Sequence, residues 1–256
     1  MTDISISCEM TNDAGPELLK QYPGRVRLLD QGISVEAHKE FKVARHAFKL
    51  EVAEMDEDDR KAFLEQAAVR LFSSEEYQEK KNILTQLSLL GNPKGHTLLQ
   101  KFLSQNDPEL GEWCALALLH SQMYLTEVFE GENYVYIATG LGGKNNLMRE
   151  SMVLLAANYV YFSDKQRSLI EKECRFQMER MGGQVESLVI RDRYALLSLL
   201  KPLSISVVDM ANTLLSAINE FETVVQCPGS ISNAEYYTEE DCLGMVDYYL
   251  EPEPDF

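Results

Sequence analysis

Apolar residues between positions 34 and 121 recur every three or four residues, which is the spacing of one face of an α-helix. The pattern predicts helices over residues 34–55, over residues 58–72, from a cap at Ser73 or Ser74 to Gly91, after Pro93, and over residues 107–121. In the first helix, the inward stripe consists of Phe41, Ala44, Phe48, Val52 and Met55. The last helix, around Trp113, is apolar on all sides, so we expect other helices to cover it and expect it to form the junction with a second domain.

The breaks between the last three predicted helices follow one pattern, Gly91-Asn92-Pro93 and Asn106-Asp107-Pro108. Glycine ends a helix, and Asn or Asp before proline begins the next one. On these residues, the stretch 80–121 resembles the HEAT-like helical repeat, although Gly111 stands where such repeats usually carry Arg. The resemblance covers one repeat and part of a second, and it implies stacked helix pairs that present surfaces to partners.

Beyond residue 130 the apolar residues form short β-branched and aromatic runs, which favour strands. Strands are predicted at residues 134–139, at 152–162, on both sides of Arg191-Asp192-Arg193 within 185–200, and at 222–227, with helices that begin at the caps Ser163 and Ser206. The second of these helices should carry Phe221 on its inward stripe. From residue 152 onward, the order strand, helix, strand, strand, helix, strand is that of the ferredoxin-like, split βαβ fold, here with residues 134–139 as an additional strand in front.

Two structural questions stay open at this level. Periodicity does not decide whether Met148–Phe162 is a strand or a buried helix. Two helices would cover one face of the sheet, and the other face is left for a partner, for the helical domain or for a dimer.

These patterns together predict an α+β protein with four segments. They are an irregular lead-in over residues 1–32 with a short helix at Glu17–Tyr22, a HEAT-like helical domain over 33–130, a ferredoxin-like domain over 131–229 and an acidic tail over 230–256. Within the tail, tyrosines and Leu250 are interleaved with carboxylates, which predicts a short helix at Glu239–Leu250 that docks on the body, followed by a disordered end. A tail that is loose throughout is the alternative.

The charge of the chain restricts its partners. The net charge is −17, so nucleic acid and an anionic membrane would be repelled over the ~8–10 Å reach of the field. A protein partner or a homo-oligomer fits better. The five cysteines are widely spaced and form no CxxC pair, and neither a signal peptide nor a long apolar run is evident, so we expect a cytoplasmic protein with reduced thiols.

The helix over residues 34–55 separates its charges into two flanks. One flank is basic (Lys39, Lys42, Arg45, His46 and Lys49) and the other is acidic (Glu36, Glu40, Glu51 and Glu54). A basic strip is unusual in an acidic protein, so Lys42, Arg45 and Lys49 are candidate residues for binding an acidic peptide, a phosphorylated partner or the chain's own tail. The alternative is a solvated face whose charges pair with glutamates one turn away.

A glycine-rich stretch after the strand at 134–139 is the candidate ligand site. Backbone N–H groups of Gly140, Gly142 and Gly143, with Lys144 and Arg149, would bind the phosphate of a metabolite or nucleotide. The stretch fits neither a P-loop, which needs Gly at Ala138 and Ser or Thr at Asn145, nor the GxGxxG fingerprint, which needs Gly at Asn145. A wide turn that joins two strands of a hairpin is the alternative.

No set of residues for catalysis or metal binding is recognisable. The four histidines lie in no metal-binding spacing and are expected to be surface or capping residues, no serine lies in a GxSxG motif, and no cofactor is implied. The sequence therefore favours a non-catalytic interaction or regulatory adaptor, with the small-ligand protein or enzyme that uses Gly140–Lys144 as the alternative.

Overall fold

The computed structural model describes residues 14–73, 76–105, 107–131, 134–157 and 161–250. The chain forms two compact units, one from Ile33–Tyr134 and the other from Met1–Gly32 together with Val135–Phe256. The first is helical and the second combines helices with strands, so the expected α+β class is confirmed. In the sequence, the helical unit is an insertion within the mixed unit and does not simply precede it.

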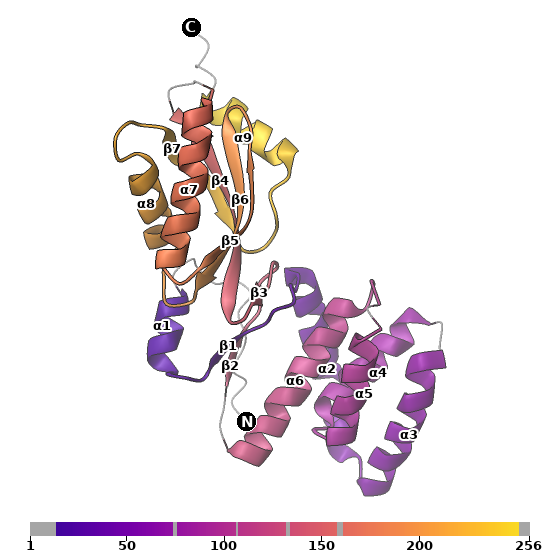
Figure 1. Cartoon of the computed structure of the whole chain (residues 1–256). Coiled ribbons are helices and arrows are strands. Elements are labelled where there is room, and N and C mark those ends of the chain that lie inside the picture. The colour runs from indigo at the N-terminus through magenta and orange to yellow at the C-terminus, as the bar shows by residue number, and fades with distance from the viewer. Residues whose placement is uncertain (1–13, 74–75, 106, 132–133, 158–160, 251–256) are drawn as a thin grey trace, which may run out of the picture. The chain divides into compact units, whose positions relative to one another are not determined.

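The described residues of the helical unit form α2 (Val35–Glu54), α3 (Glu57–Ser73), α4 (Tyr77–Leu89), α5 (Pro93–Leu103) and α6 (Gly111–Glu130) (Figure 1). Helix α6 packs against α2, α4 and α5. Trp113, Leu116 and Leu119 of α6 are all buried. The prediction that this apolar helix is covered on several sides is confirmed.

Trp113 connects three helices of this unit. Its ring stands edge-on to that of Phe41 in α2, with the ring centroids 5.2 Å apart. Its indole N–H donates a hydrogen bond of 3.1 Å to Oγ1 of Thr85 in α4. A buried indole needs such an acceptor, so this contact sets the position of α6 against its neighbours.

Two helix starts agree with the sequence. Oγ of Ser34 accepts a hydrogen bond of 3.2 Å from the backbone N–H of Ala37 at the start of α2. Oδ1 of Asn92 accepts one of 2.8 Å from Lys94 at the start of α5. Both caps satisfy backbone donors that have no partner within the first turn of a helix.

Two other predicted helix starts are wrong. Ser73 is the last residue of α3 and caps no helix, and Ser74 lies outside the described residues. Asp107 accepts hydrogen bonds from the backbone N–H groups of Glu109 and Leu110, so it closes a turn, and α6 begins only at Gly111. That helix continues to Glu130 instead of ending near Ser121.

The larger sheet is built around β4 (Leu147–Ala156), so this segment is a strand and not a buried helix. One edge of β4 pairs with β6 (Tyr194–Pro202), and its other edge pairs with β7 (Val225–Ser232) and β3 (Gly143–Lys144). β5 (Gln184–Ile190) lies beyond β6, and all of these pairs are antiparallel. With α7 (Asp164–Arg180) and α8 (Val207–Ile218), the elements follow one another in the predicted order.

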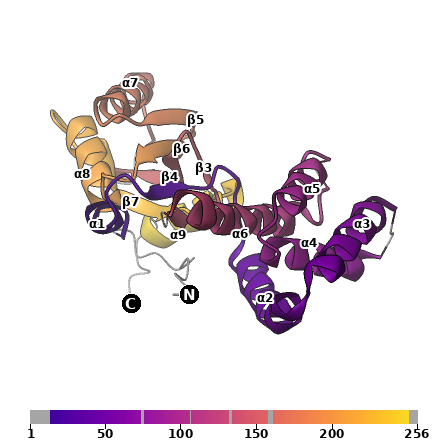
Figure 2. The ribbon, with the colours of Figure 1, turned by 90° about the horizontal axis from the view of Figure 1, so that it is seen from below.

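The two faces of β4 are buried against different helices. Met152 and Leu154 lie in a core covered by α7 and α8. Val153 and Leu155 point to the other face and pack against α9 (Glu239–Leu250) (Figure 1 and Figure 2). The face that the sequence left open is therefore covered here by α9, and the prediction that this helix docks on the body is confirmed. Residues 251–256, expected to be disordered, lie outside the described residues.

One predicted core residue of α8 is not in the core. The helix ends at Ile218, and Phe221 follows it with 89% of its surface exposed. The prediction failed because the apolar spacing in the sequence continues beyond Asn219, where the helix ends. Oδ1 of Asn219 accepts hydrogen bonds from the backbone N–H groups of Val224 and Val225.

The N-terminal segment is more regular than predicted. It forms α1 (Ala14–Gln21) and β1 (Val26–Leu28), and β1 pairs in parallel with β2 (Val135–Ile137). Val26, Leu28 and Ile137 share a small core with Met148 of β4. Residues 14–32 therefore belong to the mixed unit, whereas residues 1–13 lie outside the described part of the chain. The prediction that this strand lies in front of the larger sheet is wrong. β2 lies in the two-stranded sheet with β1.

The glycine-rich stretch is a crossing point of three backbone segments. A Cβ atom at Gly140 would lie 1.8 Å from the carbonyl oxygen of Ala234, and one at Gly142 would lie 2.3 Å from that of Asp30. Gly142 also has a φ of +63°, which disfavours any side chain. The β3–β4 hairpin turns at Asn145 and Asn146, both of which have positive φ. The glycines therefore do not form the hairpin turn that was predicted as the alternative; they allow the close approach of the backbone segments.

We predict that Gly142→Ala destabilises the mixed unit more than Gly24→Ala does. Gly24 has a φ of +73° and open space around it, so its replacement costs only the backbone penalty of about 1 kcal/mol. At Gly142 the clash with Asp30 adds roughly 1–3 kcal/mol. The measurement is amide hydrogen exchange of β4 and β6 in both variants. Equal losses of protection would contradict the crossing-point role.

Candidate functional site

The outer face of α2 exposes apolar residues in a line. Val43 is 71% exposed and Leu50 is 75% exposed, while Ala47, also exposed, lies between them at helical spacing. The opposite face of the same helix buries Phe41 and Val52 in the core of the helical unit. Because the buried face fixes the rotation of α2, the line Val43–Ala47–Leu50 is held towards solvent.

Basic side chains flank this line. Lys39, Lys42, His46 and Lys49 are exposed, and no ion pair of these lysines occurs within the part of the chain that the structure describes. The acidic flank lies towards α4, where Glu40 pairs with Nζ of Lys81 at 3.1 Å and Glu51 accepts a hydrogen bond from Gln86. We call Val43, Ala47 and Leu50, with Lys39, Lys42, His46 and Lys49, the α2 face.

Arg45 is set apart from the two lysines predicted to act with it. It is only partly exposed, and its charge contributes to the lowered pKa of His120 on α6. The structure therefore places Lys42 and Lys49 on the α2 face and Arg45 towards α6. The sequence prediction missed Val43 and Leu50, although their spacing with Ala47 repeats every three and four residues.

His120 is part of the packing and not a surface residue. Its ring stacks on Phe41, with the centroids 5.5 Å apart and the planes at 21°. Burial, followed by the charges of Arg45 and His38, lowers the pKa of His120 to about 3. The imidazole is therefore neutral in the folded protein at ordinary pH.

Two of the three glycines proposed to bind a phosphate use their backbone N–H groups within the fold. The N–H groups of Gly142 and Gly143 donate to the carbonyl oxygens of Thr139 and Asp30, and that of the neighbouring Leu141 donates to Asn233. The hydrogen bonds of Gly142 and Gly143 occupy two of the groups that would have bound a phosphate.

The two basic residues of that candidate site both lie near Glu186. Arg149 forms a two-point contact with Glu186, at 2.5 and 3.1 Å, and donates through Nη1 to the carbonyl oxygen of Leu141 at 2.8 Å. Hydrogen bonding to Glu186 raises the pKa of Arg149, and the same contact lowers that of Glu186. Lys144 is exposed at the end of β3, and its charge also lowers the pKa of Glu186. Arg149 thus links β4 to β5 across β6, and its charge is already paired with a carboxylate.

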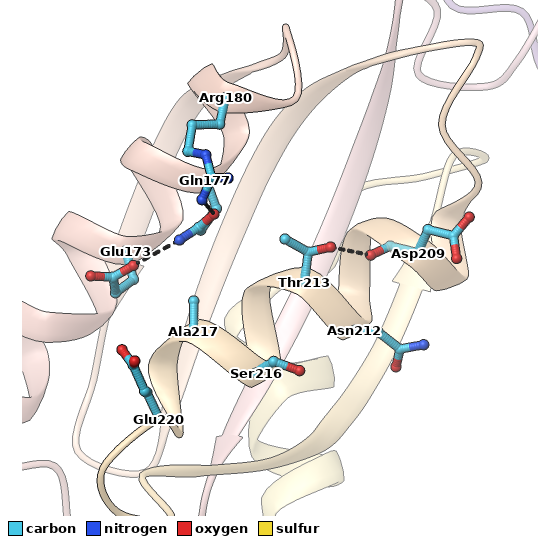
Figure 3. Close-up of a pocket in the computed structure, with 9 residues that line it drawn as sticks. All are labelled: Glu173, Gln177, Arg180, Asp209, Asn212, Thr213, Ser216, Ala217 and Glu220. Atoms are coloured by element: carbon cyan, nitrogen blue, oxygen red, sulfur yellow. Dashed lines mark hydrogen bonds between the residues drawn. The ribbon is translucent and has the colours of Figure 1, made fainter.

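An open groove of about 650 Å³ lies between α7 and α8. Figure 3 shows Glu173, Gln177 and Arg180 on α7 across from Thr213 and Ala217 on α8. The amide of Gln177 donates to Glu173 at 3.1 Å and accepts from Arg180 at 3.2 Å, so both ends of this side chain are already bound. The hydroxyl of Thr213 donates to the backbone carbonyl oxygen of Asp209, and no hydrogen bond among the described lining residues joins a hydroxyl to a carboxylate side chain.

The thiols of Cys114, Cys174 and Cys242 are buried in this fold. Burial raises the pKa of Cys114 and of Cys174 to about 12 and that of Cys242 to about 11. A thiol must ionise to attack a substrate or to bind a metal, so these side chains act as small apolar residues. Among the described residues, no three His, Cys, Asp or Glu side chains are grouped as metal ligands would be.

Glu150 of β4 and Lys201 of β6 form a buried charged pair. Their closest atoms, Oε1 and Nζ, are 3.9 Å apart, and Nζ also donates to the carbonyl oxygen of Ile205 at 2.9 Å. Neither carboxylate oxygen of Glu150 has a hydrogen-bond partner among the described residues. Burial raises the pKa of Glu150 to about 7, against the opposing effect of Lys201. Because both side chains are enclosed, the pair acts on stability and not on a ligand.

No protein-family model matches this chain, and no curated protein or solved structure matches it either. No helix in the described ranges is both long enough and apolar enough to cross a membrane. The function must therefore be inferred from the geometry of the chain itself. The α2 face is the strongest candidate site in this geometry.

We predict that Glu150 makes the mixed unit less stable as pH rises from about 4.5 to about 7. The folded state binds the proton more tightly than the unfolded state in this window, so ionisation costs stability, on the order of 3 kcal/mol in all. Denaturant unfolding of the mixed unit, followed by circular dichroism across this pH range, should show a flatter profile for Glu150→Gln than for the wild type. The control is Glu179→Gln on the exposed side of α7, which should keep the wild-type profile. Identical profiles for all three proteins would rule out the effect.

For the helical unit we predict the opposite dependence. His120 binds a proton in the unfolded state below pH 6.5 but resists it in the folded state, so stability is present above pH 6.5 and is lost as pH falls towards about 3. The loss between pH 7 and pH 5 should be about 2 kcal/mol. Trp113, the single tryptophan, reports unfolding of this unit by fluorescence. His120→Gln should remove this part of the acid sensitivity. An unchanged sensitivity would show that His120 is not its source.

Proposed function

We propose that this protein is a non-catalytic protein-interaction module whose binding surface is the α2 face. The single observation that carries the proposal is the exposed line of Val43 and Leu50 next to lysines without an ion pair among the described residues. Apolar area that is exposed in an ordered position gains free energy when a partner covers it, at about 25 cal/mol per Å². Lysines at its edge select a partner with negative charge.

The folds of the two units support this role. We propose that the helical unit is an arrangement of HEAT-like helix pairs and that the mixed unit is ferredoxin-like. The strand order β5-β6-β4-β7, with antiparallel pairs and two connecting helices, supports the second assignment. Both architectures present extended helix surfaces, and neither implies a particular chemistry.

A cytoplasmic location is part of the proposal. Cys114, Cys174 and Cys242 are free thiols in the structure. Reduced thiols are typical of proteins in the cytosol. The ligand-binding alternative at Gly140–Lys144 has less support, because the backbone donors of that stretch are used within the fold.

The test replaces the two exposed apolar residues of the α2 face. The double variant Val43→Ser/Leu50→Ser should weaken binding to a protein partner about fivefold or more, because roughly 1 kcal/mol or more of apolar burial is removed. The matched control is Val69→Ser on α3, another exposed apolar residue of the same unit. The measurement is the dissociation constant of each variant for a protein that binds the wild type.

Two outcomes would contradict the proposal. The first is equal affinity of the double variant and the control for that protein. The second is a rise in thermal stability when a phosphorylated metabolite or nucleotide is added, which disappears in Lys144→Ala. A ligand at a hundredfold excess over its dissociation constant should stabilise the wild type by about 2.7 kcal/mol. The second result would return the function to the glycine-rich stretch.

A further inference from the structure

Helix α9 also has an exposed face that combines apolar and charged residues. Its inner side is anchored, because Cys242 and Val246 are buried against Val153 and Leu155 of β4. Its start is fixed by Thr238 and Asp241, whose side chains each accept a hydrogen bond from the other residue's backbone N–H group. The helix therefore cannot rotate, and its outer side is held in one orientation.

The outer side of α9 is apolar and acidic. Leu243 is 54% exposed and Tyr248 is 80% exposed, and the exposed carboxylates Glu240 and Asp247 lie on the same side of the helix. Arg191 pairs with Glu239 at the start of this helix, whereas Glu240 and Asp247 form no ion pair among the described residues. We call Glu240, Leu243, Asp247 and Tyr248 the α9 face.

The α2 face and the α9 face complement each other. Each is one side of an ordered helix, and each carries exposed apolar residues. The charges along one edge of the α2 line are lysines, whereas its other edge carries Glu40 and Glu51; the charges of the α9 face are carboxylates. The lysine edge of α2 is therefore the part that complements α9. Both faces are exposed to solvent in the single chain. We propose that the α2 face of one copy of this protein binds the α9 face of a second copy. The inference rests on the proposed function, because it names the partner of the α2 face.

The charge of the whole chain does not prevent this contact. Two chains of net charge −17 repel each other, but at physiological salt the repulsion is screened beyond ~8 Å. Opposite charges in direct contact across the two faces are screened less. Each copy carries both faces, so every copy can bind through α2 and through α9. A contact of helix on helix lies at the small end of interfaces, so the association should be reversible with a dissociation constant of roughly 1–100 μM.

The experiment is sedimentation of the full chain over a range of concentrations that spans roughly 1–100 μM. The wild type should associate reversibly. Lys42→Glu/Lys49→Glu and Glu240→Lys/Asp247→Lys should each weaken association at least tenfold. The protein that combines all four changes should recover it, because the charges are then exchanged between the faces. Circular dichroism checks that the variants keep the fold.

Charge-matched controls lie on α7, a helix that contributes to neither face. Lys165→Glu/Lys172→Glu changes the net charge by the same amount as the α2 variant, and Glu171→Lys/Glu179→Lys by the same amount as the α9 variant; all four side chains are exposed. Both controls should associate like the wild type. Association that follows net charge in the controls as well would overturn the inference.

Failure of this inference and failure of the proposed function are distinguishable. A monomer at every concentration, or a contact between the two faces that does not depend on concentration, overturns the second-copy proposal. Binding of a different protein that is lost in Val43→Ser/Leu50→Ser but not in Val69→Ser would then still support the α2 face as an interaction surface. If the α2 variants impair neither self-association nor the binding of another protein, both the inference and the proposed function are wrong.

Discussion

The burial of β4 on both faces is the constraint on which the mixed unit depends. Alternate side chains of a strand point to opposite sides, so an apolar strand of this kind needs two separate covers. Helices α7 and α8 supply one cover, and α9 supplies the other. Both edges of β4 are also paired, by β6 on one side and by β7 and β3 on the other. The acidic C-terminal helix is therefore a structural element, and only its outer side is available for binding.

The glycine-rich stretch shows how the same residues serve structure instead of chemistry. Glycines after a strand are needed both for phosphate binding and for close approach of two backbones. Here the carbonyl oxygens of Thr139 and Asp30 accept hydrogen bonds from the N–H groups of Gly142 and Gly143, which a phosphate would require. A buried backbone donor needs a partner, and the chain's own carbonyl groups supply it at these two glycines.

The helical unit separates its core from its surface by helix rotation. Trp113 and Phe41 fix α2 against α6, and this leaves Val43 and Leu50 outside. His120 is held neutral in the same core, whereas the lysines of the α2 face remain in solvent. Cys114, Cys174 and Cys242 are buried thiols with raised pKa values, and no grouped metal ligands occur among the described residues. The proposed interaction surface rests on the exposed apolar residues of α2 and the lysines beside them.

Local patterns in the sequence determined the elements of this protein. The period of Phe41, Phe48 and Val52 predicted α2, the cap at Ser163 predicted α7, and the interleaved tyrosines predicted α9 with its observed bounds. These signals are local because a helix satisfies its own backbone hydrogen bonds.

The tertiary structure alone decided which segments meet. It paired β1 with β2 across the inserted helical unit, placed α9 on the sheet, joined Arg149 to Glu186 and enclosed Glu150 beside Lys201. It also turned Arg45 away from Lys42 and Lys49, although all three lie on one helix. Such contacts depend on long-range packing, and neither the burial of a charge nor the partner of a strand can be read from spacing along the chain.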